Sequence, residues 1–142
     1  MALINLIYVS SARTELAAKE LLRILESSAR RNTPQEVTGM LLYLNGSFMQ
    51  VLEGEEAVVD ETYARILRDP RHTGLVLIER APINARSFGH WSMGFKHLGA
   101  TDVAAHPAYA PFFSDGFDAA AIGAKKGLAF EILADFALGQ RA

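Results

Sequence analysis

The dipeptide Asn45-Gly46 is the feature that most constrains the fold, because it separates two apolar runs. The runs are TGMLLYL at 38–44 and SFMQVLEG at 47–54. Both positions of a two-residue hairpin turn need positive φ, which Asn-Gly adopts at little cost. The sequence therefore predicts a β-hairpin over residues 38–54, around which every other element must be arranged.

Apolar periodicity predicts further elements on both sides of the hairpin. They are a buried strand at 2–10, a helix at 16–31 after the N-cap Thr14, a helix at 55–69, and strands at 74–82 and 90–98. We expect the first helix to end at Asn32 or Thr33, before Pro34, and the second to stop at Pro70. Proline cannot continue a helix, and it disfavours helical backbone in the residue before it.

The order of these elements is β-α-β-β-α-β plus one strand, which predicts an α+β, ferredoxin-like fold. The expected architecture is a mixed five-stranded sheet with two helices on one face. Because a β-α-β crossover joins parallel strands, we expect strand 2–10 to lie beside strand 47–54 and parallel to it.

The pattern changes near residue 98. Residues 99–114 are rich in alanine, proline and aromatic residues, and 118–138 has the apolar spacing of one amphipathic helix. We expect residues 1–98 to form the core domain and 99–142 a C-terminal helical extension, because so short a segment cannot bury a core of its own.

The composition excludes several classes of site. The chain has no cysteine, so disulfides, thiolate metal sites and a cysteine nucleophile are ruled out. Its net charge of −2 gives no basic face, so we expect no nucleic-acid partner. His97 and His106 lack a third ligand at metal-binding spacing, so we predict no metal site. The longest uncharged stretch, 37–52, is shorter than the roughly 20 residues of a membrane span, and we expect a soluble cytoplasmic protein.

Gln50 is unusual for a strand that should be buried on both faces. On a period of two it shares a face with Phe48 and Leu52, and a buried amide without partners costs about 1–3 kcal/mol. Tyr8 on the neighbouring strand could bond to it. The residues alone leave a plain structural role open for both side chains, since most buried polar groups are simply satisfied.

Other polar residues gather at the helix ends. Asn32 can share a face with Ile24, Ser28 and Arg31, but it could also be an ordinary helix C-cap. A charged cluster near the end of the second helix could be a solvated rim or a weak phosphate site. That cluster consists of Arg65, Asp69, Arg71 and His72. Trp91 and Met93 alternate on the last strand, where a core pair is the default interpretation.

Taken together, these positions resemble the BLUF family of blue-light sensors that use flavin. The resemblance covers about residues 2–98. Its motifs are LIYVS around Tyr8, RRN ending at Asn32, TGMLLYLNGSFMQVLEG around Gln50, DPRH at 69–72 and WSM at 91–93. Several unusual positions in register are far more specific than any single motif.

The resemblance implies a flavin held without a covalent bond between the two helices, with FAD expected and FMN or riboflavin left open. Asn32 would bond to the polar edge of the ring, and Gln50 would bridge that edge and Tyr8. The implied pocket also contains Ile24, Ser28, Phe48, Leu52, Ile66 and His72, with Arg31, Arg65, Asp69 and Arg71 toward the phosphate.

The resemblance also implies a mechanism. Tyr8 would give an electron and a proton to the excited flavin, and Gln50 would exchange its hydrogen bonds, because its amide offers both a donor and an acceptor. The signal would leave through Trp91 or Met93 and the C-terminal helices to a separate protein. The absence of cysteine excludes the alternative photochemistry of a cysteinyl adduct.

We therefore expect a light-gated interaction protein that is not an enzyme and that self-associates at least as a dimer. One alternative is a ferredoxin-like ligand-binding or regulatory domain that does not respond to light. A second is an acylphosphatase-like hydrolase, which is disfavoured because the segment after the first strand, SSARTE, has no glycine for an anion-binding loop.

Overall fold

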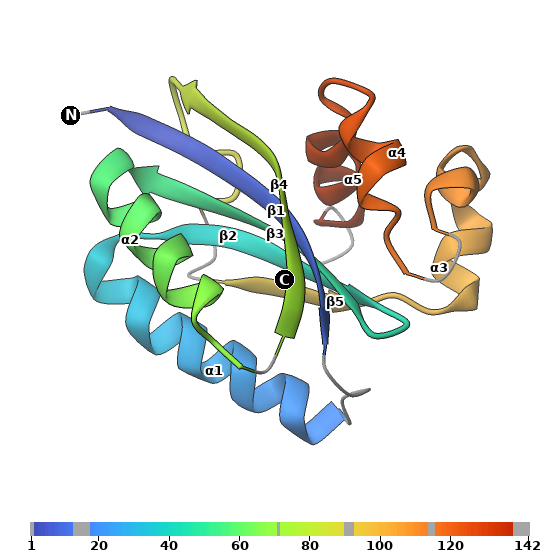
Figure 1. The fold of residues 1–142 in the computed structure, drawn as a ribbon, viewed down its shortest axis with the longest axis horizontal. Helices are drawn as coiled ribbons and strands as arrows, with labels where there is room; N and C mark the ends of the chain where they lie inside the picture. The colour runs from blue at the N-terminus through green and yellow to red at the C-terminus, as the bar shows by residue number, and fades with distance from the viewer. Residues whose placement is uncertain (1, 13–17, 71, 90–92, 114–115, 138–142) are drawn as a thin grey trace.

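The computed structural model describes residues 2–12, 18–70, 72–89, 93–113 and 116–137. The chain order is β1 (Leu3–Ala12), α1 (Ala18–Gln35), β2 (Thr38–Leu44), β3 (Ser47–Glu55), α2 (Glu56–Leu67), β4 (His72–Ile83), β5 (Gly94–His97), α3 (Ala100–Ala105), η1 (Pro107–Phe112), α4 (Ala119–Gly123) and α5 (Leu128–Ala137) (Figure 1). The predicted α+β architecture with a helical C-terminal extension is confirmed.

The five strands form one mixed sheet in the order β4-β1-β3-β2-β5. The hairpin turn has φ of 47° at Asn45 and 80° at Gly46, as predicted. β1 lies beside β3 as expected, but the two strands are antiparallel, so the predicted parallel pairing was wrong. The α1 crossover makes β2 run parallel to β1, and the hairpin then inserts the reversed β3 between them. The parallel pair in the sheet is β2 with β5.

Helix α1 does not end before Pro34, as the sequence suggested, but contains it and ends at Gln35. Glu36 follows with φ of 56°, and the amides of Glu36 and Val37 donate to the carbonyls of Thr33 and Asn32. Pro34 fits in the last turn because its ring holds φ near the helical value, and the two bonds form a Schellman motif that ends the helix at Gln35, two residues beyond Thr33. The predicted helix start, with Thr14, lies outside the described residues.

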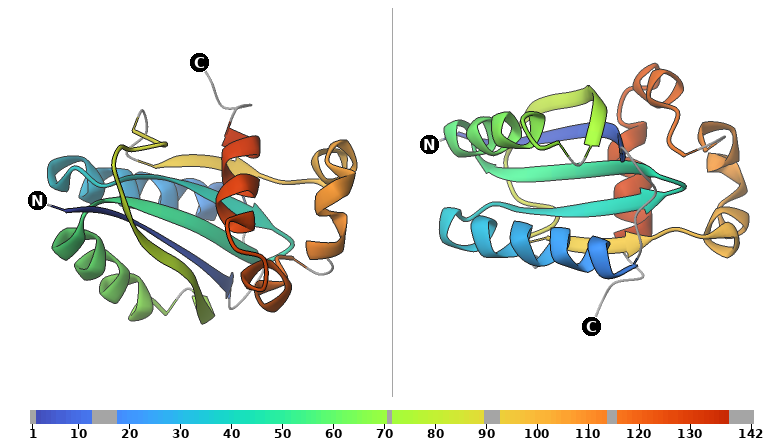
Figure 2. Two further views of the ribbon diagram at one scale, coloured as in Figure 1. Left: turned by 90° about the horizontal axis from the view of Figure 1, so that it is seen from above. Right: turned by 60° about the horizontal axis from the view of Figure 1, so that its bottom comes forward.

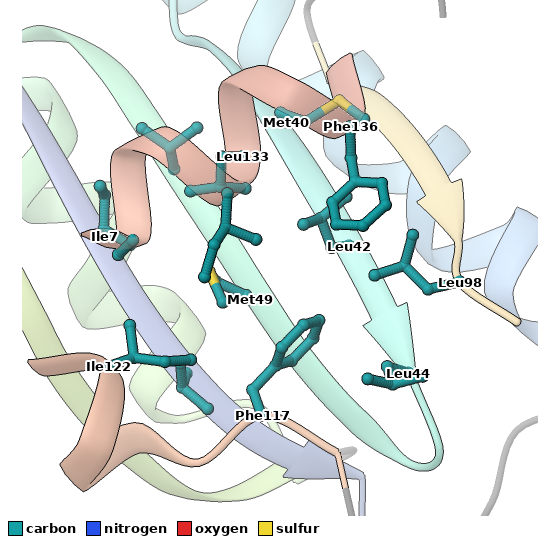
Figure 3. Packing of buried hydrophobic residues seen from close by; sticks show 14 of the residues in the cluster. Ile7, Met40, Leu42, Leu44, Met49, Leu98, Phe117, Ile122, Leu133 and Phe136 are labelled. Carbon is teal, nitrogen blue, oxygen red and sulfur yellow. The ribbon is translucent and has the colours of Figure 1, made fainter. Parts of the chain in front are cut away.

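Each face of the sheet carries its own apolar layer, because alternate side chains of a strand point to opposite faces. Helices α1 and α2 lie on one side of the sheet and α5 on the other (Figure 2). The α5 side buries alternate strand residues such as Ile7, Leu42 and Met49 against Leu133 and Phe136 (Figure 3). The C-terminal helical extension therefore covers the face of the sheet that α1 and α2 leave open.

The predicted single helix at 118–138 is two helices, α4 and α5. Gly127, with φ of 83°, precedes α5 and breaks the helical path. Asp118 caps α4 by accepting a hydrogen bond from the Ala121 amide. In the described part of the chain, no helix is both long and apolar enough to cross a membrane.

Candidate functional site

A cleft lies between α1 and α2, above the central strands β1 and β3. The space between its walls is about 690 Å³, part of which is open to solvent. Its lining residues are Tyr8, Ile24, Ser27, Ser28, Arg31, Asn32, Leu41, Phe48, Gln50, Leu52, Thr62, Arg65, Ile66 and Asp69. Most of the residues that the sequence nominated are thus brought together in one place.

Tyr8 and Gln50 form a cross-strand pair at the base of this cleft. They are direct partners in the β1–β3 register, and the Tyr8 hydroxyl donates to Gln50 Oε1. On its other side, Gln50 Nε2 donates to the Met93 sulfur at 3.2 Å. A thioether is a weak acceptor. The Gln50 oxygen therefore accepts from a hydroxyl, while its NH₂ has only a weak acceptor in Met93. A stronger acceptor on a bound ligand could draw this NH₂ group away from Met93.

The Tyr8 phenol is held in its neutral form. Burial raises its pKa well above the ordinary range, and the nearby Tyr63 and Asp69 add to the shift. The Tyr63 ring lies 5.6 Å from the Tyr8 ring, centroid to centroid, at the side of the cleft formed by α2. Burial also raises the pKa of Tyr63. Tyr8 can therefore give up a proton only when another change, such as oxidation, makes it acidic.

Asn32 supplies a buried polar side chain to the α1 wall. Its residue is only 3% exposed, as buried as Tyr8 at 3% and Gln50 at 4%. Its backbone carbonyl accepts from the Val37 amide at 3.0 Å within the Schellman motif. This bond fixes the helix end, and so fixes where the Asn32 side chain enters the cleft lining.

The cleft combines three kinds of surface. Buried amide and phenol groups lie at its base, and apolar side chains such as Ile24, Leu52 and Ile66 form its walls. Its rim is charged, with an exposed Arg31 and the half-buried Arg65 and Asp69. This donor set suits a flat heteroaromatic ring with an amide-like edge and a phosphate-bearing tail, because arginine binds phosphate well.

Met93 was nominated but does not line the cleft. Met93 is buried and contacts Gln50 from the side of β5. Arg71, Trp91 and the side chain of His72 lie outside the described residues.

Ser27, Leu41 and Thr62 line the cleft but were not nominated. The signals were weak: Ser27 precedes Ser28 on the helix, and Thr62 lies on the apolar side of the predicted second helix. Leu41 stands directly opposite Gln50 in the β2–β3 register, and that pairing, which fixes the shared face, could have identified it.

A comparison with protein families matches residues 3–94 to the family described as BLUF, sensors of blue-light using FAD. Among curated proteins, the photoactivated adenylate cyclase subunit beta of Euglena longa is 38% identical over 92 residues. That match covers 64% of this chain and 11% of the cyclase subunit. The blue light- and temperature-regulated antirepressor BluF of Escherichia coli is 40% identical over 93 residues, covering 64% of this chain and 23% of the antirepressor.

Solved structures give the same result. The dark-state structure of BlrB, a BLUF protein, superposes with a TM-score of 0.71 at 30% identity and covers 92% of this chain and 97% of BlrB. A bacterial light-regulated adenylyl cyclase superposes with a TM-score of 0.72 at 34% identity over 77% of this chain and 32% of the cyclase.

Proposed function

Because the chain belongs to the BLUF family of blue-light sensors that use flavin, we propose that the cleft between α1 and α2 binds FAD and that light rearranges the hydrogen bonds of Gln50. The observation that carries this proposal is the buried relay from Tyr8 through Gln50 to Met93 at the base of the cleft. The matched part of this chain spans about a tenth of the cyclase relative.

The lining suits each part of a flavin. Asn32 and Gln50 would bond to the polar edge of the ring, while Ile24, Leu52 and Ile66 would contact its faces. Tyr8, Asn32 and Gln50 are almost fully buried, and a hydrogen bond to a ligand is worth most there, because the surroundings exclude water. Arg31 and Arg65 at the rim would bind the phosphates of FAD or FMN.

A bound flavin would supply the absorption of blue light and an electron acceptor. The protein would supply the rest. Tyr8, neutral in the dark, donates its proton toward Gln50 Oε1. If the Gln50 amide turns over or tautomerises, its oxygen and nitrogen exchange roles. Met93 would then lose its donor and Tyr8 its acceptor, so the change reaches the residue that directly precedes β5.

We further propose that this chain is a sensor without catalytic activity of its own, that it is cytoplasmic and self-associates, and that its output acts on a separate protein. Residues 1–98 would be the photosensor unit, and 99–142 would carry the output. The support is that the family match ends at residue 94, while the helices after it cover the opposite face of the same sheet.

Absorption spectroscopy tests the flavin and the switch together. The purified chain, reconstituted with FAD, should show flavin bands that shift to the red under blue light and recover in the dark. Tyr8→Phe and Gln50→Leu should keep the flavin and lose the shift. Tyr43→Phe is the matched control, because Tyr43 is buried in the same apolar layer but does not line the cleft.

Two results would refute the proposal. A chain that cannot be loaded with flavin would indicate a ligand-binding domain that does not respond to light. A normal reversible shift in both Tyr8→Phe and Gln50→Leu would leave flavin binding intact but exclude the roles given to these two side chains.

A further inference from the structure

Glu53 is a buried carboxylate that the proposed photochemistry does not use. It lies on β3, three residues after Gln50, and is only 1% exposed. By the alternation of the strand, Gln50 points to the α1–α2 side of the sheet and Glu53 to the α5 side. Burying a carboxylate costs free energy unless its oxygens are well hydrogen-bonded. The hydrogen-bond partners of Glu53 therefore indicate its role.

Both oxygens of Glu53 hold the connection between β4 and β5. The Ser87 amide donates to Oε2 and the Phe88 amide to Oε1, each at 2.8 Å. The Thr38 hydroxyl donates to Oε1 at 3.5 Å. Hydrogen bonds from backbone amides to an ionised carboxylate are among the stronger ones in proteins. One side chain thus fixes two consecutive residues of a loop.

Arg86 reinforces the same anchor without pairing directly with the carboxylate oxygens. Its Nη1 donates to Thr38 Oγ1 at 2.9 Å and to the Glu53 backbone carbonyl at 3.0 Å. Arg86, Ser87 and Phe88 are therefore all bonded to the ends of β2 and β3. The loop is fastened to the central hairpin at this point, although it enters from β4 at the far edge of the sheet.

This loop also connects the two apolar layers. Phe88 is buried in the layer on the α5 side, where its ring meets the Phe130 ring of α5 edge-on at 5.8 Å. Met93, five residues later, is buried in the layer on the α1–α2 side and accepts from Gln50. Phe88, which the Glu53 anchor holds, therefore contacts α5, while Glu53 shares its strand with Gln50 on the other face.

We propose that Glu53 is the positioning residue that couples Gln50 on one face of the sheet to α5 on the other. By holding Ser87 and Phe88, it ties their backbone to β3, so a displacement of β3 at Gln50 is passed to the contact between Phe88 and Phe130. Without the anchor, the loop would absorb that displacement. This inference concerns the output of the switch and rests on the proposed light response.

The substitution Glu53→Gln separates this role from packing. Glutamine has nearly the same shape, but it can accept at one oxygen only, and its NH₂ would face a backbone amide that also donates. Hydrogen exchange is measured by mass spectrometry on the full chain loaded with FAD, in the dark and under blue light. It reports both on the Ser87 and Phe88 amides and on α5. Glu55→Gln on the same strand is the matched control.

In the wild-type chain, light should change the exchange of α5. In Glu53→Gln the flavin should keep its reversible red shift, while the Ser87 and Phe88 amides exchange about tenfold faster in the dark. The light-induced change in α5 should disappear. Glu55→Gln should behave as wild type. An α5 response of full size in Glu53→Gln, or no α5 response in a wild-type chain that does shift, would overturn the proposal.

Two further measurements keep the test decisive. If Glu53→Gln does not fold, Phe88→Leu serves instead, because it leaves the backbone anchor intact and reduces the side-chain contact with Phe130. An undiminished α5 response in that variant overturns the coupling. If the wild-type chain shows no red shift, the proposed function fails. The hydrogen bonds of Glu53 to Ser87 and Phe88 are then tested on the chain without flavin. If these two amides exchange at the same rate in Glu53→Gln as in the wild-type chain, the anchoring role of Glu53 is refuted.

Discussion

At the scale of single residues, the neutral state of Tyr8 makes stability depend on alkaline pH. Burial, with Tyr63 and Asp69, raises the pKa of the folded Tyr8 above that of an unfolded tyrosine, near 10. Above pH 10 the unfolded chain therefore binds fewer protons than the folded one, and the free energy of unfolding falls, by at most about 1.4 kcal/mol per pH unit for one group. Urea denaturation from pH 9 to 11.5 should show that the free energy of unfolding falls less steeply with pH in Tyr8→Phe than in the wild-type chain. Equal slopes in the two proteins would contradict this prediction.

The side chains of the site were largely predictable from sequence, and the exceptions have a physical reason. Gln50 stood out because an amide inside a buried strand needs partners, and its bond to Tyr8 follows from the strands being neighbours. Leu41 and Thr62 gave no such signal, because an apolar or hydroxyl side chain on an inward face fits a core equally well. Which inward residues border a cleft depends on how far apart the helices lie, and no local pattern encodes that distance.

At the scale of elements, apolar periodicity located strands and helices, while their ends and directions needed long-range information. Pro34 is a strong stop signal, yet Glu36 adopts the left-handed backbone that a Schellman motif requires, and a glutamate gives no hint of it. The apolar spacing of residues 118–138 predicts one helix, whereas Gly127, with φ of 83°, separates two. The direction of β3 beside β1 follows from combining the crossover with the hairpin, a step that neither motif shows alone.

Helix α5 provides an element-scale prediction, because Leu133 is fully buried between the helix and the sheet. Leu133→Ala should lower the free energy of unfolding by about 2–5 kcal/mol, the usual cost of such a cavity. Since α5 shares its core with the strands, the loss should appear in one cooperative transition, followed by circular dichroism in urea. Exposed Lys126→Ala is the control. Two separate transitions, of which only one moves, would show that the extension folds independently.

At the scale of the whole molecule, the sheet divides two tasks between its faces. One apolar layer includes Tyr8, Phe48 and Leu52 and borders the cleft, while the other packs the C-terminal helices. The central strands contribute alternate residues to both layers, so the same backbone supports the site and the proposed output surface. A change in the position of β3 at Gln50 therefore affects both apolar layers, because close-packed interiors transmit strain.

Neighbouring leucines on β2 test this division. Leu41 lines the cleft, and Leu42, equally buried, faces the α5 layer. Each change to alanine should reduce the free energy of unfolding by about 2–5 kcal/mol, because each leaves a cavity. Only Leu41→Ala should also weaken FAD binding and move the flavin bands, since only that side chain borders the ligand. Fluorescence titration with FAD and urea denaturation of both variants separate the two effects. If Leu42→Ala weakened binding as much as Leu41→Ala, the faces would not act separately, and the flavin site would depend on the whole core.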